Sequence, residues 1–428
     1  MQICLVTTSQ PSANPRLVKE ADALVEAGYD VHVLAAHRVD WATAADPALV
    51  ATRGWRLTFI DWRRDVAPVL YWKSRIRNNL ARHVHGVPML KSLVLPWAID
   101  RLTPELTAMA KAITADVYVA HNPGALPAAA AAARAHGALL GFDAEDFHSG
   151  EFEEGDRSAL FRTVQEIERR FVPQCHYVTA ASPGIADAYA PLSTCGPPTT
   201  ILNVFPLKTR PSAPVAARVT GPLRLYWFSQ TIGHDRGLEA VVSAMGRLGR
   251  RSTELHLQGR WQDGYEDSLR GIASDVGVSQ DAIIWHPPAS SDELVRIAST
   301  FDVGLATETG RTLNRRIALT NKIFTYVLAG IATLATRTPA QAALVSQLGQ
   351  AAQSYDPENV EGAAGALGGW IENRSLLDAS RLHAWALGES RYNWDIEKEK
   401  YLRIVGALAP PLAISRVARA AQAVEGHG

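Results

Sequence analysis

The sequence predicts an α/β fold in which two doubly wound domains face a central crevice. Three observations lead to this prediction. The chain has 428 residues, which is too long for one ordinary core and suits two domains of roughly 150–200 residues each. In both halves, short apolar runs of strand length alternate with stretches of helical period, as in units with parallel strands. Between the halves, residues 206–222 carry four prolines and no apolar period, which indicates a linker.

The first half opens with a strand–helix–strand unit. Residues 1–8 form a short apolar run, as expected of a strand buried on both faces. Apolar residues then recur at helical spacing from Leu17 to Val25, Gly28 follows as a helix cap, and residues 31–36 form a second strand. Further elements of this half are expected as strands at 116–120, 138–143, 177–180 and 199–202, and as an alanine-rich helix at 126–136.

The second half repeats this alternation directly after the linker. Its strands are expected at 223–228, 254–258, 282–286, 303–306 and 332–335, and its helices at 237–248, 292–299 and 321–328. Doubly wound sheets bind ligands at the carboxyl ends of their strands, so the crevice between two such sheets is the expected ligand site. We therefore expect a first domain at 1–205, a linker at 206–222, a second domain at 223–390 and a tail at 409–428.

Composition narrows the function. Lys plus Arg equals Asp plus Glu at 43 each, so no basic excess is available for a dedicated nucleic-acid binder. The three cysteines, Cys4, Cys175 and Cys195, lack metal-ligand spacing and fit a reducing compartment. No export signal and no long apolar run is recognisable, so we expect a cytoplasmic protein.

Several phosphate- and metal-handling motifs do not occur in the sequence. It has no GxxxxGK[ST] loop, no HExxH, no GxSxG, no CxxC and no Asp-x-Asp, and its first strand does not run into GxGxxG. We expect an enzyme without metal or cofactor that holds phosphates with side-chain cations and helix ends.

Residues 62–97 do not fit the strand–helix alternation. Arginines and lysines alternate there with apolar residues such as Trp72, Leu80 and Leu90. One interpretation is an amphipathic surface that touches anionic lipid or a lipid-linked acceptor and holds the protein on the inner face of the membrane. The other is a solvated pair of helices that covers the first domain.

The order and spacing of several motifs resemble family-4 glycosyltransferases. In the second half these are FSQTIGHDRGLEAVVSAM (228–245), LHLQGRW (255–261) and DVGLATETGRTLNRRIALTNKIFTYVLAGIATLAT (302–336). In the first half they are NPRLVKEADALVEAGYDVHVLA, VAHNPGALPAA and GFDAEDFH, and the last is YNWDIEKEKYLRIV near the end of the chain. This resemblance reaches to about residue 408.

The resemblance implies the GT-B fold, two Rossmann-like domains that face a crevice, with a helix at 391–408 that closes back on the first domain. It also implies transfer of a sugar, with retention and without metal, from a nucleotide-diphosphate donor to an acceptor. The sequence does not name that acceptor, which is a glycan, a lipid-linked intermediate or a small molecule.

Two cations are expected to hold the diphosphate and to act in catalysis. Arg236 precedes Gly237 at a helix start, where backbone N–H groups and the helix dipole favour an anion. It stands where the family has a phosphate-binding lysine. Lys322 follows Asn321 in the first turn of a second helix, an unfavourable place for a cation unless an anion lies there. The alternatives are an exposed helix-start arginine and an interdomain ion pair.

The sequence departs from the family pattern at the donor site. Gln230 stands where an arginine is usual, so one diphosphate cation is missing. Ile317 and Thr325 occupy the positions of two glutamates that contact the sugar and the ribose, and we expect Glu308 to supply the missing carboxylate. The other donor residues expected from the motifs are Gly233, Gly259, Asn321 and His286, the last beside Trp285 and Pro287 at the base.

On the first domain, His121 and Asn122 end one strand, and His121 stands where the family has a histidine near the transferred sugar. A neutral imidazole there can orient a hydroxyl or the developing cationic sugar ring. Asp143, Asp146 and His148 follow the next strand and are expected to contact the acceptor, although such carboxylates also cap helices.

Three other functions share a two-domain crevice. One is a catalytically inactive GT-B paralogue that serves as a binding partner or scaffold, which Ile317 and Thr325 suggest. A sugar-nucleotide epimerase would need no acceptor, and a solute-binding protein would need an export signal.

Overall fold

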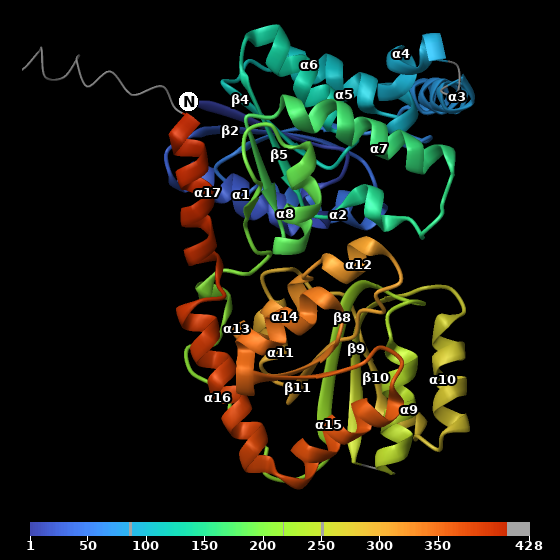
Figure 1. Ribbon diagram of the computed structural model, residues 1–428, viewed down its shortest axis with the longest axis vertical. Helices are drawn as coiled ribbons and strands as arrows, with labels where there is room; N and C mark the ends of the chain where they lie inside the picture. The colour runs from blue at the N-terminus through green and yellow to red at the C-terminus, as the bar shows by residue number, and fades with distance from the viewer. Residues whose placement is uncertain (85–87, 217, 250–251, 409–428) are drawn as a thin grey trace, which may run out of the picture.

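The structure, a computed structural model, describes residues 1–84, 88–216, 218–249 and 252–408, and the tail expected at 409–428 lies outside them. It contains two parallel β-sheets with helices on both faces, one sheet in each half of the chain (Figure 1). No helix of this described part is both long and apolar enough to cross a membrane.

The first sheet has seven strands in the order β3-β2-β1-β4-β5-β6-β7, and all of its pairs are parallel. The central strand β1 is apolar and buried along nearly its whole length, because helices cover both faces of the sheet. The strands are β1 (Gln2–Thr7), β2 (Asp30–Ala36), β3 (Arg56–Ile60), β4 (Val117–His121), β5 (Leu139–Ala144), β6 (Tyr177–Ala180) and β7 (Thr199–Thr200).

The second sheet has six parallel strands in the order β10-β9-β8-β11-β12-β13. Both orders reverse direction beside the first strand of the sheet, which opens a ligand crevice at the carboxyl ends of the strands. The strands are β8 (Leu223–Ile232), β9 (Thr253–Trp261), β10 (Ile283–His286), β11 (Val303–Ala306), β12 (Ala332–Thr336) and β13 (Ala352–Tyr355).

Helices connect the strands in each half. Those of the first half are α1 (Pro15–Glu26), α2 (Asp40–Val50), α3 (Pro68–Val84), α4 (Pro88–Ile99), α5 (Thr103–Ala112), α6 (Leu126–His136), α7 (Ala159–Phe171) and α8 (Pro183–Tyr189). Those of the second are α9 (Leu238–Leu248), α10 (Tyr265–Asp275), α11 (Leu294–Ala298), α12 (Leu313–Ile317), α13 (Asn321–Ala329), α14 (Pro339–Leu348), α15 (Val360–Glu372), α16 (Arg374–Ser390) and α17 (Trp394–Leu408).

The predicted fold class is observed, and the two strands that the sequence did not reveal, β3 and β13, lie at sheet edges. The edge strand β3 is only partly buried, so it lacks the continuous apolar run of the inner strands. Residues 62–97 form α3 and most of α4, a pair of helices on the outside of the first domain.

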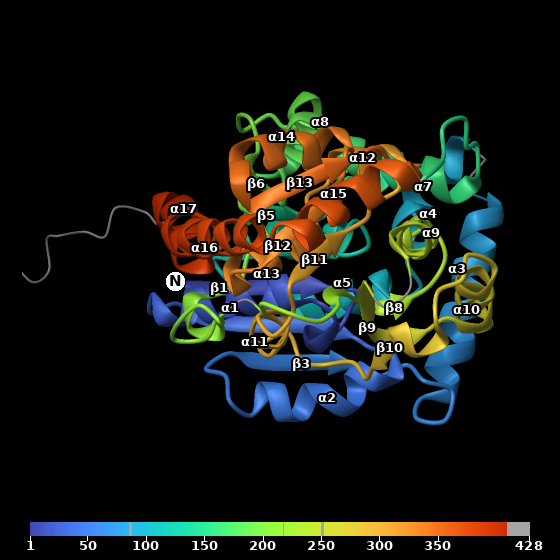
Figure 2. The same ribbon diagram turned by 90° about the horizontal axis from the view of Figure 1, so that it is seen from below.

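The last helix, α17, returns to the first domain and lies beside α1 (Figures 1 and 2). Three contacts hold it there. The Trp394 amide donates to the Phe205 carbonyl over 2.9 Å, and Asp395 accepts from the Leu207 amide over 2.8 Å. Lys398 pairs with Glu26 of α1 at 3.1 Å. The start of the linker region is therefore held by the end of the described chain.

Candidate functional site

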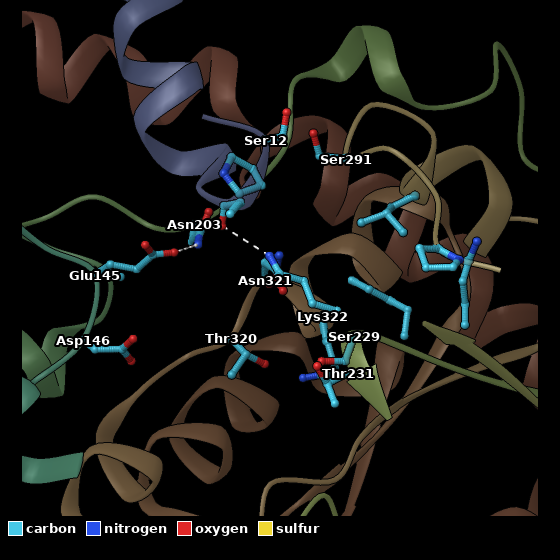
Figure 3. Close-up of a pocket in the computed structure, with 18 of the residues that line it drawn as sticks. Ser12, Glu145, Asp146, Asn203, Ser229, Thr231, Ser291, Thr320, Asn321 and Lys322 are labelled. Carbon is cyan, nitrogen blue, oxygen red and sulfur yellow. Dashed lines mark hydrogen bonds between the residues drawn. The ribbon is translucent and has the colours of Figure 1, made fainter. Parts of the chain in front are cut away.

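A cleft of about 1280 Å³ lies between the two domains, at the carboxyl ends of both sheets. Its first-domain wall comes from the segments after β1 and β5 and from α2, and its second-domain wall from the segments after β8, β9, β10 and β11 and from the start of α13. Figure 3 shows Glu145 and Asp146 on one side of the cleft and Asn321 and Lys322 on the other.

Arg236 and Lys322 lie on the second-domain wall, at the amino ends of α9 and α13. Gly237 caps α9 in the left-handed conformation, with φ of 71°, and a Cβ atom there would lie 2.5 Å from the Thr307 carbonyl oxygen. Only glycine fits so close an approach. The sequence GLEAVV therefore sets the start of α9 against β11 and brings Arg236 to the cleft.

A buried carboxylate, Glu308, joins the cations of this wall. Its Oε1 accepts from Lys322 Nζ over 3.1 Å, and its Oε2 accepts from Arg315 Nη1 over 3.0 Å. Burial alone would raise the pKa of Glu308, but Lys322 and Arg315 lower it to about 2. Glu308 therefore stays ionised. It acts as the counter-ion of two cations and does not line the cleft, unlike the donor-contacting carboxylate that we expected.

Three cations share this single carboxylate. Burial lowers the pKa of Lys322, and Arg236 and Arg315 lower it further against the opposing effect of Glu308. Burial and Arg315 likewise lower the pKa of Arg236. Burial contributes most to both pKa shifts, and repulsion between the neighbouring cations adds to it. The wall therefore carries an excess of positive charge that an anion can relieve.

The other expected donor residues divide into two groups. Gln230 and Asn321 line the cleft, whereas Gly233, Gly259 and His286 are not among its lining residues. Gly259 has φ of 148°, and a Cβ atom there would lie 2.2 Å from the Ser229 carbonyl oxygen, so it permits the close pairing of β8 and β9. His286 Nε2 lies 3.0 Å from His256 Nδ1. Their contacts are internal to the second domain.

Ile317 and Thr325, at the positions of the usual glutamates, also lie away from the cleft lining. The Ile317 carbonyl accepts from Ser182 Oγ over 2.7 Å, and the side chain packs against Gly184 of the first domain. Thr325 is fully buried, and its hydroxyl donates to the Asn321 carbonyl within α13. Ile317 therefore contributes to the domain interface, and Thr325 contributes a hydrogen bond within α13.

On the first-domain wall, His121 lies within a buried ionic cluster. Its Nδ1 is 3.5 Å from Asp143, and its Nε2 is 3.5 Å from Glu20. Arg16 donates to both carboxylate oxygens of Asp143 at 2.7 Å each. Burial would lower the pKa of His121, but Glu20 and Asp143 raise it. The ring faces carboxylates with both nitrogens and also lines a small pocket at the strand ends, so its expected place near the transferred sugar stays a prediction.

Asp143 therefore lies beneath the site, with only 1% of its surface exposed. As the end of a buried strand it needs a counter-charge, and Arg16 of α1 provides one. Asp143 also lines the small pocket at the strand ends, so its expected contact with the acceptor stays a prediction.

The same cluster has the spacing of a metal site. Glu20, His121 and Asp143 bring their ligand atoms within 4.8 Å of one another. Arg16, however, lies 2.7 Å from Asp143 and 3.4 Å from Glu20, so its guanidinium already supplies the positive charge that these carboxylates need. These residues fit a protein ion pair better than a cation site.

A smaller pocket of about 160 Å³ opens between the strand ends of the first domain. All five residues expected on the first-domain side line it, namely His121, Asn122, Asp143, Asp146 and His148, as does Glu145, which the sequence did not single out. Asn122 has φ of 94°, an uncommon conformation for a residue with a side chain, and it starts the turn into α6. His148 Nε2 is buried and has no hydrogen-bond partner in the part of the chain described above.

The two walls of the cleft carry opposite charges. On the first domain, four carboxylates and one guanidinium line it: Glu145, Asp146, Glu151, Glu153 and Arg53. On the second, five cations and two carboxylates do so: Arg236, Arg260, Arg311, Arg315, Lys322, Asp235 and Asp292. An anionic ligand is therefore favoured on the second-domain wall.

Solved structures of other proteins share this architecture. Anabaena Alr3699/HepE, solved in complexes with UDP and with UDP-glucose, superposes with a TM-score of 0.67. It is 14% identical, and the match covers 95% of this chain and 100% of that one. The sucrose-phosphate synthase of Thermosynechococcus elongatus has a TM-score of 0.68 at 12% identity, over 95% and 99% of the two chains. S. aureus TarM has a TM-score of 0.65 at 9% identity, over 94% and 99%.

The chain has the GT-B fold. Both sheets and the crevice between them take part in these superpositions, since each covers nearly the whole of both chains. No family model matches the chain, and no curated protein sequence is measurably similar to it.

Sequence reasoning missed several residues of this GT-B cleft. Arg315 lies on a helix of five residues, too short to show a face in its sequence. Thr320 precedes α13, and its hydroxyl is buried with no hydrogen-bond partner among the described residues. A Thr-Asn-Lys sequence at a helix start is the signal that points to it, because threonine is a common cap. Glu145 lies in the sequence between two expected residues, Asp143 and Asp146. No sequence pattern identifies it, because only the direction of its side chain in the structure brings it to the cleft.

The ionic cluster beneath the first-domain wall generates a stability prediction. Asp143→Asn keeps the side-chain shape but leaves Arg16 buried without its main counter-ion, so the free energy of unfolding should fall by about 3–5 kcal/mol. Urea denaturation followed by circular dichroism measures this. The control is Asp187→Asn, because Asp187 is exposed on α8. Equal stability of the two variants would contradict the assignment.

Proposed function

We propose that the chain is a glycosyltransferase that moves a sugar from a nucleotide-diphosphate donor on the second-domain wall to an acceptor on the first-domain wall. The observation that carries this proposal is the group of Arg236, Arg315 and Lys322 around the single carboxylate of Glu308. Two helix amino ends meet the same wall. A diphosphate is the ligand that such cations and backbone N–H groups suit best.

The structural relatives support a nucleotide-sugar donor. The Anabaena protein was solved with UDP and with UDP-glucose, and the TarM structure also contains UDP. We propose the same ligand class for this chain, without a choice of base.

In the proposed reaction, the acceptor hydroxyl attacks the anomeric carbon from the face that the nucleotide leaves. A carbon–oxygen bond to the acceptor forms as the bond to the donor phosphate breaks, and the hydroxyl proton moves to the leaving phosphate oxygen. The cations stabilise the charge that develops on the diphosphate. Positioning of both substrates between the domains supplies the rest of the rate enhancement. No metal and no further cofactor takes part in this proposal.

The acceptor is proposed to lie against Glu145, Asp146 and His148. Carboxylates accept hydrogen bonds from hydroxyls and repel anions, so this wall favours a hydroxyl-rich, uncharged group at the reacting end. A glycan, the sugar of a lipid-linked intermediate and a small polyol all meet this condition.

Two alternatives give different results in the same assays. An inactive paralogue, suggested by Ile317 and Thr325, binds a nucleotide without turnover. An epimerase consumes the nucleotide sugar without any acceptor.

Nucleotide binding tests the donor site. Calorimetric titration with UDP, GDP, dTDP and ADP should identify one that binds, and Arg236→Ala and Lys322→Ala should each weaken it by about 1.5–3 kcal/mol. This corresponds to a loss of roughly 10- to 100-fold in affinity. Arg337→Ala is the matched control, because Arg337 is an exposed second-domain arginine paired with Asp356. If none of the four nucleotides binds, the proposed donor site does not exist.

The stereochemistry of transfer is a separate prediction. With a donor of a single anomeric configuration and any acceptor that supports turnover, the product should keep that configuration. Proton NMR of the new glycosidic bond measures it. An inverted product contradicts the attack from the leaving face, although it leaves the assignment as a transferase intact.

We also propose that the outer face of α3 contacts a membrane surface. The burial pattern of α3 is the opposite of that in an ordinary surface helix. Its polar residues Ser74 and Asn78 are buried, whereas its apolar residues Ile76 and Leu80 are 64% and 62% exposed. Val69 and Trp72 continue this apolar face at helical spacing. Eight of the large apolar side chains exposed in the described chain lie in residues 66–97: Val66, Val69, Trp72, Ile76, Leu80, Leu90, Leu93 and Trp97.

Positive charge accompanies this apolar face. Arg64 and Arg75 lie over the Trp72 ring, and no carboxylate pairs with Lys73 or Arg75 within the described residues. Apolar side chains flanked by unpaired cations are typical of helices that lie on anionic lipid. The helix lies at the outer edge of the first domain, on the opposite side from α17 (Figures 1 and 2).

Vesicle co-sedimentation tests this contact. The wild type should bind phosphatidylcholine vesicles that contain phosphatidylglycerol, and much less those of phosphatidylcholine alone. The double variant Ile76→Ser, Leu80→Ser should lose at least about tenfold in binding, since each apolar side chain contributes roughly 1.5–3 kcal/mol when buried. Leu382→Ser is the control, because Leu382 is 51% exposed on the distant α16. Equal binding of wild type and double variant would overturn the contact.

A further inference from the structure

Position 230 offers no cation to a diphosphate. The Gln230 side chain donates instead to the Ala13 carbonyl of the first domain over 3.2 Å. The proposed donor is strongly anionic, so another residue of the wall must supply this missing charge.

Arg315 is the residue placed to do so. It lines the cleft from α12, and 37% of its side chain is exposed. Its Nη1 donates to Glu308, and no other nitrogen of this side chain has a hydrogen-bond partner in the described chain. A guanidinium has five N–H donors. Most of the donors of Arg315 are thus free for a ligand in the cleft.

The charge around Arg315 points to the same ligand. Arg315 lies close enough to Arg236 and Lys322 to influence the ionisation of both. Glu308 provides only one negative charge for the three cations. A diphosphate group that bridges them neutralises this excess, whereas a neutral ligand does not.

The backbone of Arg315 is fixed by the first domain. The neighbouring Asn314 is 4% exposed and crosses the domain interface with both ends of its amide group. Its Oδ1 accepts from the Phe147 amide over 2.9 Å, and its Nδ2 donates to Asp146 Oδ1 over 2.7 Å. Ile317, at the end of the same helix, accepts from Ser182 of the first domain. The first domain therefore sets where Arg315 lies.

We propose that Arg315 is the diphosphate-binding cation that this chain uses in place of one at position 230, and that Asn314 positions it through the first domain. The inference rests on the proposed donor site and assigns it a residue of the 302–336 motif that the sequence did not single out.

The experiment is a calorimetric titration with UDP, GDP, dTDP and ADP, and the nucleotide that binds is used for all variants. Arg315→Gln should lower its affinity roughly 10- to 100-fold, as expected for a lost charged hydrogen bond. The matched control is Arg316→Gln, since Arg316 is the next residue, pairs with Glu154 at 2.7 Å and does not line the cleft. That control should bind like the wild type.

Two further variants separate a direct contact from a structural role. The double variant Gln230→Arg, Arg315→Gln should regain a large part of the lost affinity, because it restores a cation on the same wall. Asn314→Ala should lose severalfold in affinity while Arg315 is still present. Arg315→Gln should also leave the affinity for the corresponding nucleoside, which lacks phosphates, unchanged.

The outcomes distinguish this inference from the proposed function. If Arg315→Gln binds the nucleotide like the wild type while Arg236→Ala does not, the role of Arg315 is overturned and the donor site stands. Equal losses in Arg315→Gln and Arg316→Gln overturn the role as well, because they indicate a general effect of surface charge. A wild type that binds none of the four nucleotides overturns both proposals.

Discussion

The second-domain wall depends on the pairing of one buried carboxylate. Glu308 follows β11 and is held by Lys322 of α13 and by Arg315 of α12, so one ionic group joins a strand end to two helices. Thr336 of the neighbouring strand β12 donates its hydroxyl to the Glu308 carbonyl, so this strand is joined to the same residue. A carboxylate removed from water is costly unless it is paired, and a cation without its partner is equally costly. The cations are therefore positioned by the protein's own contacts, which is the preorganisation that stabilisation of a developing anion requires.

The domain interface combines interactions of very different strength. Arg53 pairs with Asp292 at 3.3 Å and Arg316 pairs with Glu154 at 2.7 Å, but Asp292 and Glu154 are largely exposed. Exposed ion pairs contribute about 0–1 kcal/mol each. Asn314 is buried and makes two hydrogen bonds to the first domain, one to a backbone amide and one to the Asp146 carboxylate. A neutral hydrogen bond contributes about 0.5–1.5 kcal/mol and one to a charged group about 1.5–3 kcal/mol, so separation of the domains is opposed more by this one side chain than by either pair.

The sequence was informative where a local pattern determines the structure. Apolar runs predicted the inner strands, such as β11 and β6, because helices bury both faces of the sheets. The same criterion failed for β3, whose edge position leaves RLTFI only partly buried. Helix starts also carry local signals, which explains why Arg236 and Lys322 were identified and do line the cleft.

Contacts between distant segments were beyond the reach of such patterns. Glu20 of α1 and Asp143 of β5 face the two ring nitrogens of His121, and the prediction for His121 included neither partner. Nothing local to VAHNP indicates these partners. Likewise, only the packing of α12 decides that Arg315 lines the cleft while Arg316 meets Glu154 at the edge of the first domain. The expected role of Glu308 changed for the same reason, since its two partners come from residues that follow it on separate helices.

The segment from Glu308 to Lys322 links the proposed donor site to the arrangement of the two domains. It carries the counter-ion, three cations of the wall (Arg311, Arg315 and Lys322) and, in Asn314, the interdomain tether. Because Asn314 and Arg315 are adjacent, a movement of one domain against the other must either displace Arg315 or break the bonds of Asn314. Coupling of this kind is reciprocal. If the proposed donor site holds a diphosphate, the affinity that the ligand gains from this arrangement of the domains equals the stability that the arrangement gains from the ligand.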